Sequence, residues 1–238
     1  MQDRRSAWLA SHPGAGAAFR EEDPLSFVSP VDEGPTLEVR WICSGALTTS
    51  MIDWFGASSI DIETREDVYL VAEGVRGLSV KIRGGTQLDL KVARGSRGVL
   101  AVPGRARGEL ESWQKWAFPL PSMPEGTIGL ADWIPVRKVR RIRMFSRAGD
   151  APVEHAQTPS DGAWCAVELT DVSVDDEQWW TLGFEAAGSP GAMRGALDAA
   201  VALVFGHRLP DGSELTVADS ISYMDWLRTG RPERGRPS

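Results

Sequence analysis

Alternating apolar and polar residues flank a Gly-Gly pair in the segment 78–92, and this pattern predicts a β-hairpin. Leucine, valine and isoleucine share one face of the predicted hairpin. The other face is polar and carries several charges, on Ser79, Lys81, Arg83, Gln87, Asp89 and Lys91. A single such hairpin is most often an ordinary solvated surface, so the question is whether other strands carry the same charged face.

Further segments alternate in the same way and predict strands at 36–43, 60–71, 108–118, 135–147, 164–172 and 180–186. Helical spacing predicts a short helix within 46–55, a longer one from Pro190 to Gly206 capped by Ser189, and a last short one within 218–228. Most of the predicted strands have an apolar face opposite a face with ionisable residues. Those ionisable residues include Glu38, Arg40, Glu111, Lys115, Glu168 and Glu185.

The segment 135–147 is the most basic of the chain, and its valine, isoleucine and methionine favour a strand over a helix. Both of its faces mix apolar and basic residues, so the pattern alone does not fix which face points inward. We place Arg141 and Arg143 inward. Taken alone, the segment is equally compatible with a solvated edge strand or a nucleic-acid patch.

Charged faces on so many strands are compatible with two architectures. An open sandwich leaves them in water, whereas a closed barrel turns them toward a hydrated lumen. We predict an α+β fold that is mainly antiparallel β, with a closed eight-stranded, tunnel-like barrel and flanking helices. Residues 35–229 form this domain, 1–34 an N-terminal arm with a short helix at 4–10, and 230–238 a disordered tail. Helices or a second subunit, in a homodimer, would cover the apolar outside.

Composition narrows the functional class. The 238 residues are 42% hydrophobic and 25% charged, typical of a soluble globular protein, and the net charge of −7 argues against a partner that is nucleic acid or an anionic membrane. No apolar run reaches the length of a membrane span or forms a signal-peptide core. Two cysteines in apolar contexts indicate buried free thiols and a reducing, cytoplasmic location. Three scattered histidines give little basis for a histidine metal site or a serine triad.

Both signs of charge on the predicted inner faces suggest one kind of chemistry. Arginine and lysine can clamp the oxygens of a polyanion, while carboxylates hold a divalent cation that bridges the same anion and water. The predicted partner is therefore a small anionic or phosphorylated ligand.

The order and spacing of several motifs within 36–228 resemble the CYTH superfamily of triphosphate tunnel enzymes, which includes thiamine triphosphatases, inorganic triphosphatases and class IV adenylyl cyclases. The motifs that carry this resemblance are Thr36–Arg40, Arg65–Leu70, Ser79–Arg83, Leu88–Lys91, Arg140–Arg141, Glu168–Asp171, Gly183–Glu185 and Ser222–Leu227.

The resemblance implies an eight-stranded tunnel that binds a triphosphate together with Mg²⁺ or Mn²⁺. It assigns Glu38, Glu168 and Glu185 as catalytic and metal-binding residues. It assigns phosphate binding to Arg40, Lys81, Arg83, Lys91 and Arg141, and the charged faces add Lys115 and Arg143 as substrate-binding residues. In the opening Glu-x-Glu-x-Lys motif of the family, this chain has Thr36 in place of the first glutamate and Arg40 in place of the lysine.

Three functions follow as hypotheses. The first is a metal-dependent phosphohydrolase acting on inorganic triphosphate or a small organic triphosphate, with a pyrophosphate-forming cyclase as a lesser branch. The second, which the loss of a carboxylate at Thr36 supports, is a noncatalytic binder of a polyphosphate, nucleotide or other anionic metabolite. The third is a barrel adapted to unrelated small-molecule chemistry, with aromatic residues such as Trp113 lining its lumen.

Overall fold

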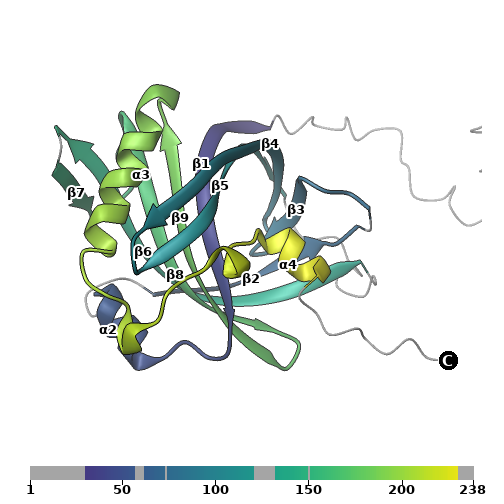
Figure 1. Ribbon diagram of the computed structural model, residues 1–238. Coiled ribbons are helices and arrows are strands. Elements are labelled where there is room, and N and C mark those ends of the chain that lie inside the picture. The colour runs from purple at the N-terminus through teal and green to yellow at the C-terminus, as the bar shows by residue number, and fades with distance from the viewer. Residues whose placement is uncertain (1–29, 57–61, 73, 121–131, 150, 230–238) are drawn as a thin grey trace, which may run out of the picture.

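A closed antiparallel β-barrel forms the body of the protein (Figure 1). The computed structural model describes residues 30–56, 62–72, 74–120, 132–149 and 151–229. The predicted helix at 4–10, most of the predicted N-terminal arm and the tail at 230–238 lie outside these residues. The strands are β1 (Val31–Ser44), β2 (Ile62–Leu70), β3 (Leu78–Arg83), β4 (Gln87–Val102), β5 (Ala106–Pro119), β6 (Trp133–Ala148), β7 (Ala151–His155), β8 (Ala163–Val174) and β9 (Glu177–Gly188).

Strand pairing closes the sheet on itself. The strand order is β2-β3-β4-β5-β1-β9-β8-β6-β7, and an additional pairing of β2 with β6 joins the two ends of the eight-stranded ring. The ninth strand, β7, pairs with β6 at residues 144–148, beyond the part of β6 that pairs with β2. The predicted eight-stranded antiparallel barrel with flanking helices is therefore confirmed.

The predicted hairpin is β3 and β4, in which Lys81 lies opposite Asp89. Its turn uses Gly84 and Gly85 at φ values of 54° and 77°, in the left-handed region that glycine adopts at little cost. Strand β4 continues to Val102, well beyond the predicted hairpin, and pairs along most of its length with β5. The long β4–β5 ribbon gives one wall of the barrel its height.

Helix α3 (Pro190–Val204) packs against the outside of the barrel, mainly over β6, β8 and β9 (Figure 1). Its apolar side chains, such as Leu197 and Ala200, share a core with Leu169, Leu182 and Phe184 of the strands. Each fully buried leucine or phenylalanine contributes about 1.5–3 kcal/mol. The helix α2 (Thr49–Phe55) adds residues to the same core. The apolar strand faces thus point outward, as the barrel hypothesis requires.

A second apolar cluster lies at one end of the barrel. Helix α4 (Tyr223–Thr229) contributes Met224, Trp226 and Leu227, which pack on side chains of β1, β2, β6 and β8. Tyr223 stacks on Tyr69 with ring centroids 5.7 Å apart. Two short 3-10 turns, η3 (Pro210–Gly212) and η4 (Val217–Asp219), connect α3 to α4. The C-terminal helix therefore covers this end of the barrel.

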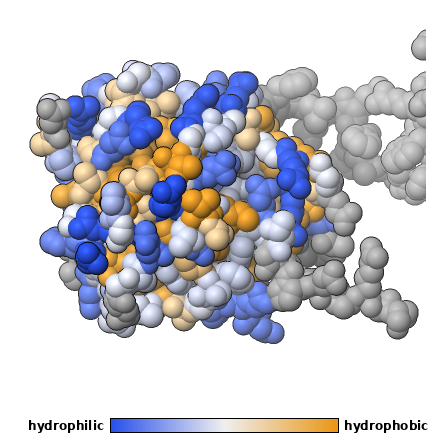
Figure 2. Space-filling model, viewed as in Figure 1, coloured by the Kyte–Doolittle hydropathy of each residue, from blue (hydrophilic) through white to orange (hydrophobic). Residues whose placement is uncertain are grey.

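The outer surface carries both hydrophilic and hydrophobic side chains, and Figure 2 shows an apolar patch among hydrophilic residues on the face toward the viewer. Among the described residues, no helix is both long and apolar enough to cross a lipid bilayer.

Candidate functional site

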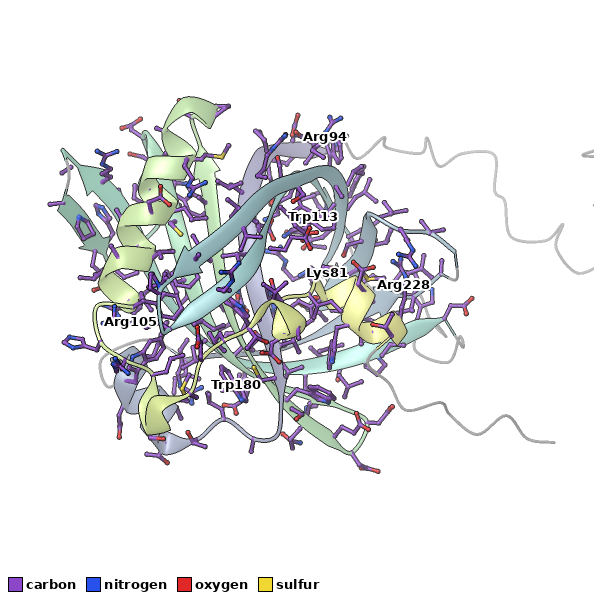
Figure 3. All side chains as sticks on the ribbon, in the orientation of Figure 1. Lys81, Arg94, Arg105, Trp113, Trp180 and Arg228 are labelled. Atoms are coloured by element: carbon purple, nitrogen blue, oxygen red, sulfur yellow. The ribbon has the colours of Figure 1, made fainter. Side chains whose placement is uncertain are left out.

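The inner faces of the strands and the segment 220–225 enclose a cavity of about 260 Å³. Figure 3 shows Lys81 and Trp113 in the interior of the ring of strands. Trp180 instead packs against the apolar core that includes residues of α3. The lining is strongly charged. Its basic members are Arg40, Arg65, Lys81, Arg83, Lys91, Lys115, Lys138 and Arg140, and its acidic members are Glu38, Asp89, Glu109, Glu111, Glu168, Glu185 and Asp225.

We call Arg65, Asp67, Lys81 and Lys138 the basic cluster. In this cluster, the carboxylate of Asp67 faces three cations, those of Arg65, Lys81 and Lys138. Lys81 Nζ and Lys138 Nζ lie 3.0 Å and 2.9 Å from the same oxygen, Asp67 Oδ2. Arg65 Nε lies 3.1 Å from Asp67 Oδ1. Asp67 and Lys138 are almost completely buried. Two further carboxylates pair with these cations, because Lys81 Nζ also lies 3.6 Å from Asp89 Oδ2 and an Arg65 nitrogen lies 3.0 Å from Glu63 Oε1.

The pKa values of the cluster follow from this crowding. Burial lowers the pKa of Lys81 to about 8, with Arg83 and Arg65 adding to the decrease and Asp67 and Asp89 opposing it. Burial and neighbouring Lys81 also hold the pKa of Lys138 well below its ordinary value, against the attraction of Asp67. For Asp67, burial would raise the pKa, but the three cations outweigh it and lower the pKa. An added anion would relieve the repulsion among these cations.

A second charged group of the cavity is centred on Glu38 and Glu185. These two residues lie side by side on the paired strands β1 and β9. Lys91 Nζ lies 2.7 Å from Glu38 Oε1 and 3.2 Å from Glu185 Oε2, and Lys115 Nζ lies 2.7 Å from Glu185 Oε1. Although burial opposes it, the attraction of Glu185 and Glu38 raises the pKa of Lys115. Thr36 Oγ1 also donates to Glu38 Oε1, at 2.5 Å. Lys91 therefore bridges the two carboxylates, and Lys115 adds a second cation to Glu185.

Glu168 forms a third group with two arginines. Arg140 Nε donates to Glu168 Oε2 at 3.0 Å, and the Arg40 guanidinium lies 3.6 Å from Glu168 Oε1. Arg140 and Arg40 lower the pKa of Glu168 well below its ordinary value, against the effect of burial. Arg40 also lies over the ring of Tyr223, at 4.9 Å, and fits because Gly183 beneath it has no side chain. Glu168 is therefore held by arginine on two sides.

Most of the predicted site residues line this one cavity: Glu38, Arg40, Lys81, Arg83, Lys91, Lys115, Glu168 and Glu185. Their roles as ligands of a substrate remain a prediction.

The inward placement of Arg141 and Arg143 is wrong. Arg141 pairs with Asp171 at 3.1 Å, and Arg143 pairs with Glu154 and donates to the Phe55 carbonyl oxygen. Both belong to the outer face of β6. The inner face carries Lys138 and Arg140 together with apolar residues such as Val136, which packs in the end cluster around α4. That apolar content made the inner face of β6 resemble a face that packs on a core.

A simple signal distinguishes the inner face of β6. The chain has four lysines, Lys81, Lys91, Lys115 and Lys138, and all of them line the cavity. Arginine supplies the positive charge elsewhere. Lysine content thus points to Lys138, and with it to Arg140 on the same face.

The three predicted metal ligands have different ion-pair partners, and their role in metal binding remains a prediction. Glu168 pairs with Arg40 and Arg140, whereas Glu38 and Glu185 share Lys91. Within the described ranges, no group of three or more histidine, cysteine, aspartate or glutamate residues is arranged to hold a metal ion. The pair Glu38 and Glu185 nevertheless suits Mg²⁺, which usually takes one or two protein carboxylates and completes its shell with water and substrate phosphates.

Comparison with known proteins gives a limited result. No family model matches the chain, and no curated protein shows significant similarity to it. Among solved structures, the chain is similar to a conserved hypothetical protein from Pyrococcus furiosus, with a TM-score of 0.41 and 15% identity. The match covers 79% of this chain and 98% of that one.

Proposed function

We propose that the barrel binds a small phosphorylated anion in its lumen. The observation that carries this proposal is the basic cluster, in which Lys81, Lys138 and Arg65 surround the carboxylate of Asp67. Together with Arg83, these cations outnumber the carboxylates that they pair with, those of Asp67, Asp89 and Glu63. Arg83 lines the same cavity with its side chain 31% exposed, and its Nε donates to Asp89 Oδ2 at 2.8 Å. Phosphate oxygens accept several charge-assisted hydrogen bonds at once, which this group of donors can supply.

The size of the cavity limits the ligand. A volume of about 260 Å³ is just below the usual range for pockets that enclose drug-sized molecules, about 300–1,000 Å³. It suits a di- or triphosphate, or a phosphate ester of a small organic group. Among the described residues of the lining, aromatic side chains such as Trp113 and Tyr223 can contact such a group.

Metal-dependent hydrolysis of a triphosphate, as in the CYTH superfamily that the sequence resembles, is the second candidate. The adjacent carboxylates of Glu38 and Glu185 favour it, because they could hold Mg²⁺ or Mn²⁺ together with substrate phosphates. Arginine and lysine of the cavity would stabilise the charge on the transferring phosphoryl group. Tripolyphosphate, thiamine triphosphate and nucleoside triphosphates are the substrates to compare.

Calorimetry with tripolyphosphate, first in EDTA and then with Mg²⁺ or Mn²⁺, tests binding, and release of phosphate tests hydrolysis. Binding in EDTA without turnover under any condition supports a binder alone, whereas turnover that requires the metal and disappears in Glu38→Gln supports the hydrolase. Arg83→Ala should weaken binding at least tenfold. Arg194→Ala, which removes an exposed arginine on α3, is the matched control. Absence of binding by any phosphorylated compound would overturn the proposal.

A further inference from the structure

Two tyrosines line the cavity where helix α4 begins. Tyr223, the first residue of α4, stacks on Tyr69 of β2 with the ring centroids 5.7 Å apart. Lys138 Nζ lies 4.0 Å from the centroid of the Tyr223 ring, and the Arg40 guanidinium lies 4.9 Å from it. Both distances are within the range of cation–π attraction. The ring of Tyr223 therefore contacts one cation of the basic cluster and one of the two arginines that hold Glu168.

Lys138 is also held on its other sides. Its ammonium donates to Asp67 Oδ2 at 2.9 Å and to Tyr69 Oη at 2.7 Å, and its side chain is 3% exposed. The same oxygen of Asp67 lies 3.0 Å from Lys81 Nζ, which lines the cavity. A displacement of Lys138 would therefore move Asp67 and, with it, Lys81.

Arg40 lies between the Tyr223 ring and the barrel wall. Its Nη1 donates to Thr181 Oγ1 at 3.1 Å, and a methyl group at Gly183 would lie 2.7 Å from the guanidinium carbon. The backbone N–H of Ile221 donates to the Arg40 carbonyl oxygen at 3.1 Å, so the chain that leads into α4 is attached to β1 at the same residue. The position of the Arg40 side chain therefore depends on α4 as well as on the strands.

We propose that Tyr223 is a positioning residue of the anion site, and that its ring holds Arg40 and Lys138 in place when α4 is docked. The proposal rests on the proposed function, because the ligand concerned is the phosphorylated anion of the cavity. An aromatic face attracts cations through its quadrupole and adds no negative charge. A carboxylate in the same place would also hold the two cations, but it would repel a phosphate. Cations that are fixed in advance lose less conformational entropy when the anion binds.

Calorimetry with tripolyphosphate and the full-length protein tests this role. Tripolyphosphate has no organic group, so a change in its affinity does not reflect a lost contact between such a group and the tyrosine ring. Tyr223→Leu should weaken binding at least tenfold. Tyr223→Phe, which restores the ring without the hydroxyl group, should bind at least fivefold more tightly than Tyr223→Leu. Val201→Ala, which removes two methyl groups from the buried core on α3, is the matched control for lost stability and should keep the affinity within threefold.

Amide hydrogen exchange gives a second readout, which needs no variant to fold. The N–H groups of Ile221 and Trp226 donate to the carbonyl oxygens of Arg40 and Ser222, at 3.1 Å and 2.9 Å. If docking of α4 favours anion binding, then anion binding favours docking of α4 by the same factor. Saturating tripolyphosphate should therefore slow the exchange of these two amides at least threefold in the natural protein.

Three results would overturn this inference and leave the proposed function standing. The first is an affinity of Tyr223→Leu within threefold of that of the natural protein. The second is a loss in Tyr223→Phe or Val201→Ala that equals the loss in Tyr223→Leu. The third is an exchange rate of the two amides that bound tripolyphosphate does not change. Failure of the proposed function is distinct, since the natural protein would then bind neither tripolyphosphate nor any other phosphorylated compound.

Discussion

Replacement of Asp67 by asparagine tests the electrostatics of the basic cluster most directly. The amide has the same shape as the carboxylate, so the change removes the charge that Lys81 and Lys138 share and little else. A contact of 3 Å between unit charges amounts to about 5–6 kcal/mol at an effective dielectric constant near 20. Part of this gross value is lost again to desolvation, and breaking a buried pair costs about 3–5 kcal/mol net.

We therefore expect Asp67→Asn to lower the free energy of unfolding at pH 7 by about 3–5 kcal/mol. For a domain of this size, that corresponds to a decrease in Tm of about 10 °C. Denaturant titration followed by tryptophan fluorescence measures the first quantity, and thermal denaturation followed by circular dichroism the second. Asp198→Asn, which breaks an exposed pair with Arg194 on α3, should change stability by less than about 1 kcal/mol.

The loss of stability in Asp67→Asn should also depend on pH. The direction of this dependence follows from the pKa values of Lys81 and Lys138. Without the carboxylate, the folded-state pKa values of Lys81 and Lys138 fall further below the ordinary value of about 10.4 that the unfolded chain has. Between these values the unfolded chain binds more protons, so the free energy of unfolding of the variant rises with pH. The difference from the natural protein should shrink between pH 7 and 10. A loss that is the same at both pH values, or no larger than that of Asp198→Asn, would refute this reasoning.

Three further predictions concern the cavity wall. Arg140→Ala should weaken tripolyphosphate binding at least tenfold by calorimetry, whereas Arg141→Ala on the outer face should leave it unchanged; equal effects would contradict the assignment of inner and outer faces. Gly183→Ala places a methyl group 2.7 Å from the Arg40 guanidinium and should lower the free energy of unfolding by about 1–3 kcal/mol, measured by denaturant titration. Affinity for tripolyphosphate should fall as pH rises through about 8, because Lys81 loses its proton there; an affinity that stays constant from pH 7 to 9 would exclude a role for this ammonium.

Much of the barrel could be predicted from alternation, most clearly at β3, which keeps apolar and polar residues on strictly opposite faces. Strand β7 was missed because its five residues include a proline and it pairs only with β6. The far half of β4 was missed because Gly95 and Gly98 interrupt the alternation at register shifts, which a sequence pattern reads as the end of a strand.

The site residues were predictable where the polar face of a strand carries charges without apolar residues, as for Lys81 and Arg83. The prediction failed where the inner face of a strand changes from apolar to charged residues. On β6, Val136 packs against the end cluster while Lys138 and Arg140 face the cavity, so one face serves two environments. Sharing of one carboxylate among several cations was also beyond the sequence, because it depends on pairing between strands distant in the chain.

Helix α4 covers one end of the barrel, and this limits how a ligand can reach and leave the cavity. Met224, Trp226 and Leu227 fill the space where a continuous pipe would open on that side. With this end filled, we expect a ligand of the cavity to enter and leave from the other side, and we do not expect a long polymer to pass through the barrel. The protein should therefore accept small molecules or the terminus of a chain, and reject internal stretches of polyphosphate or RNA.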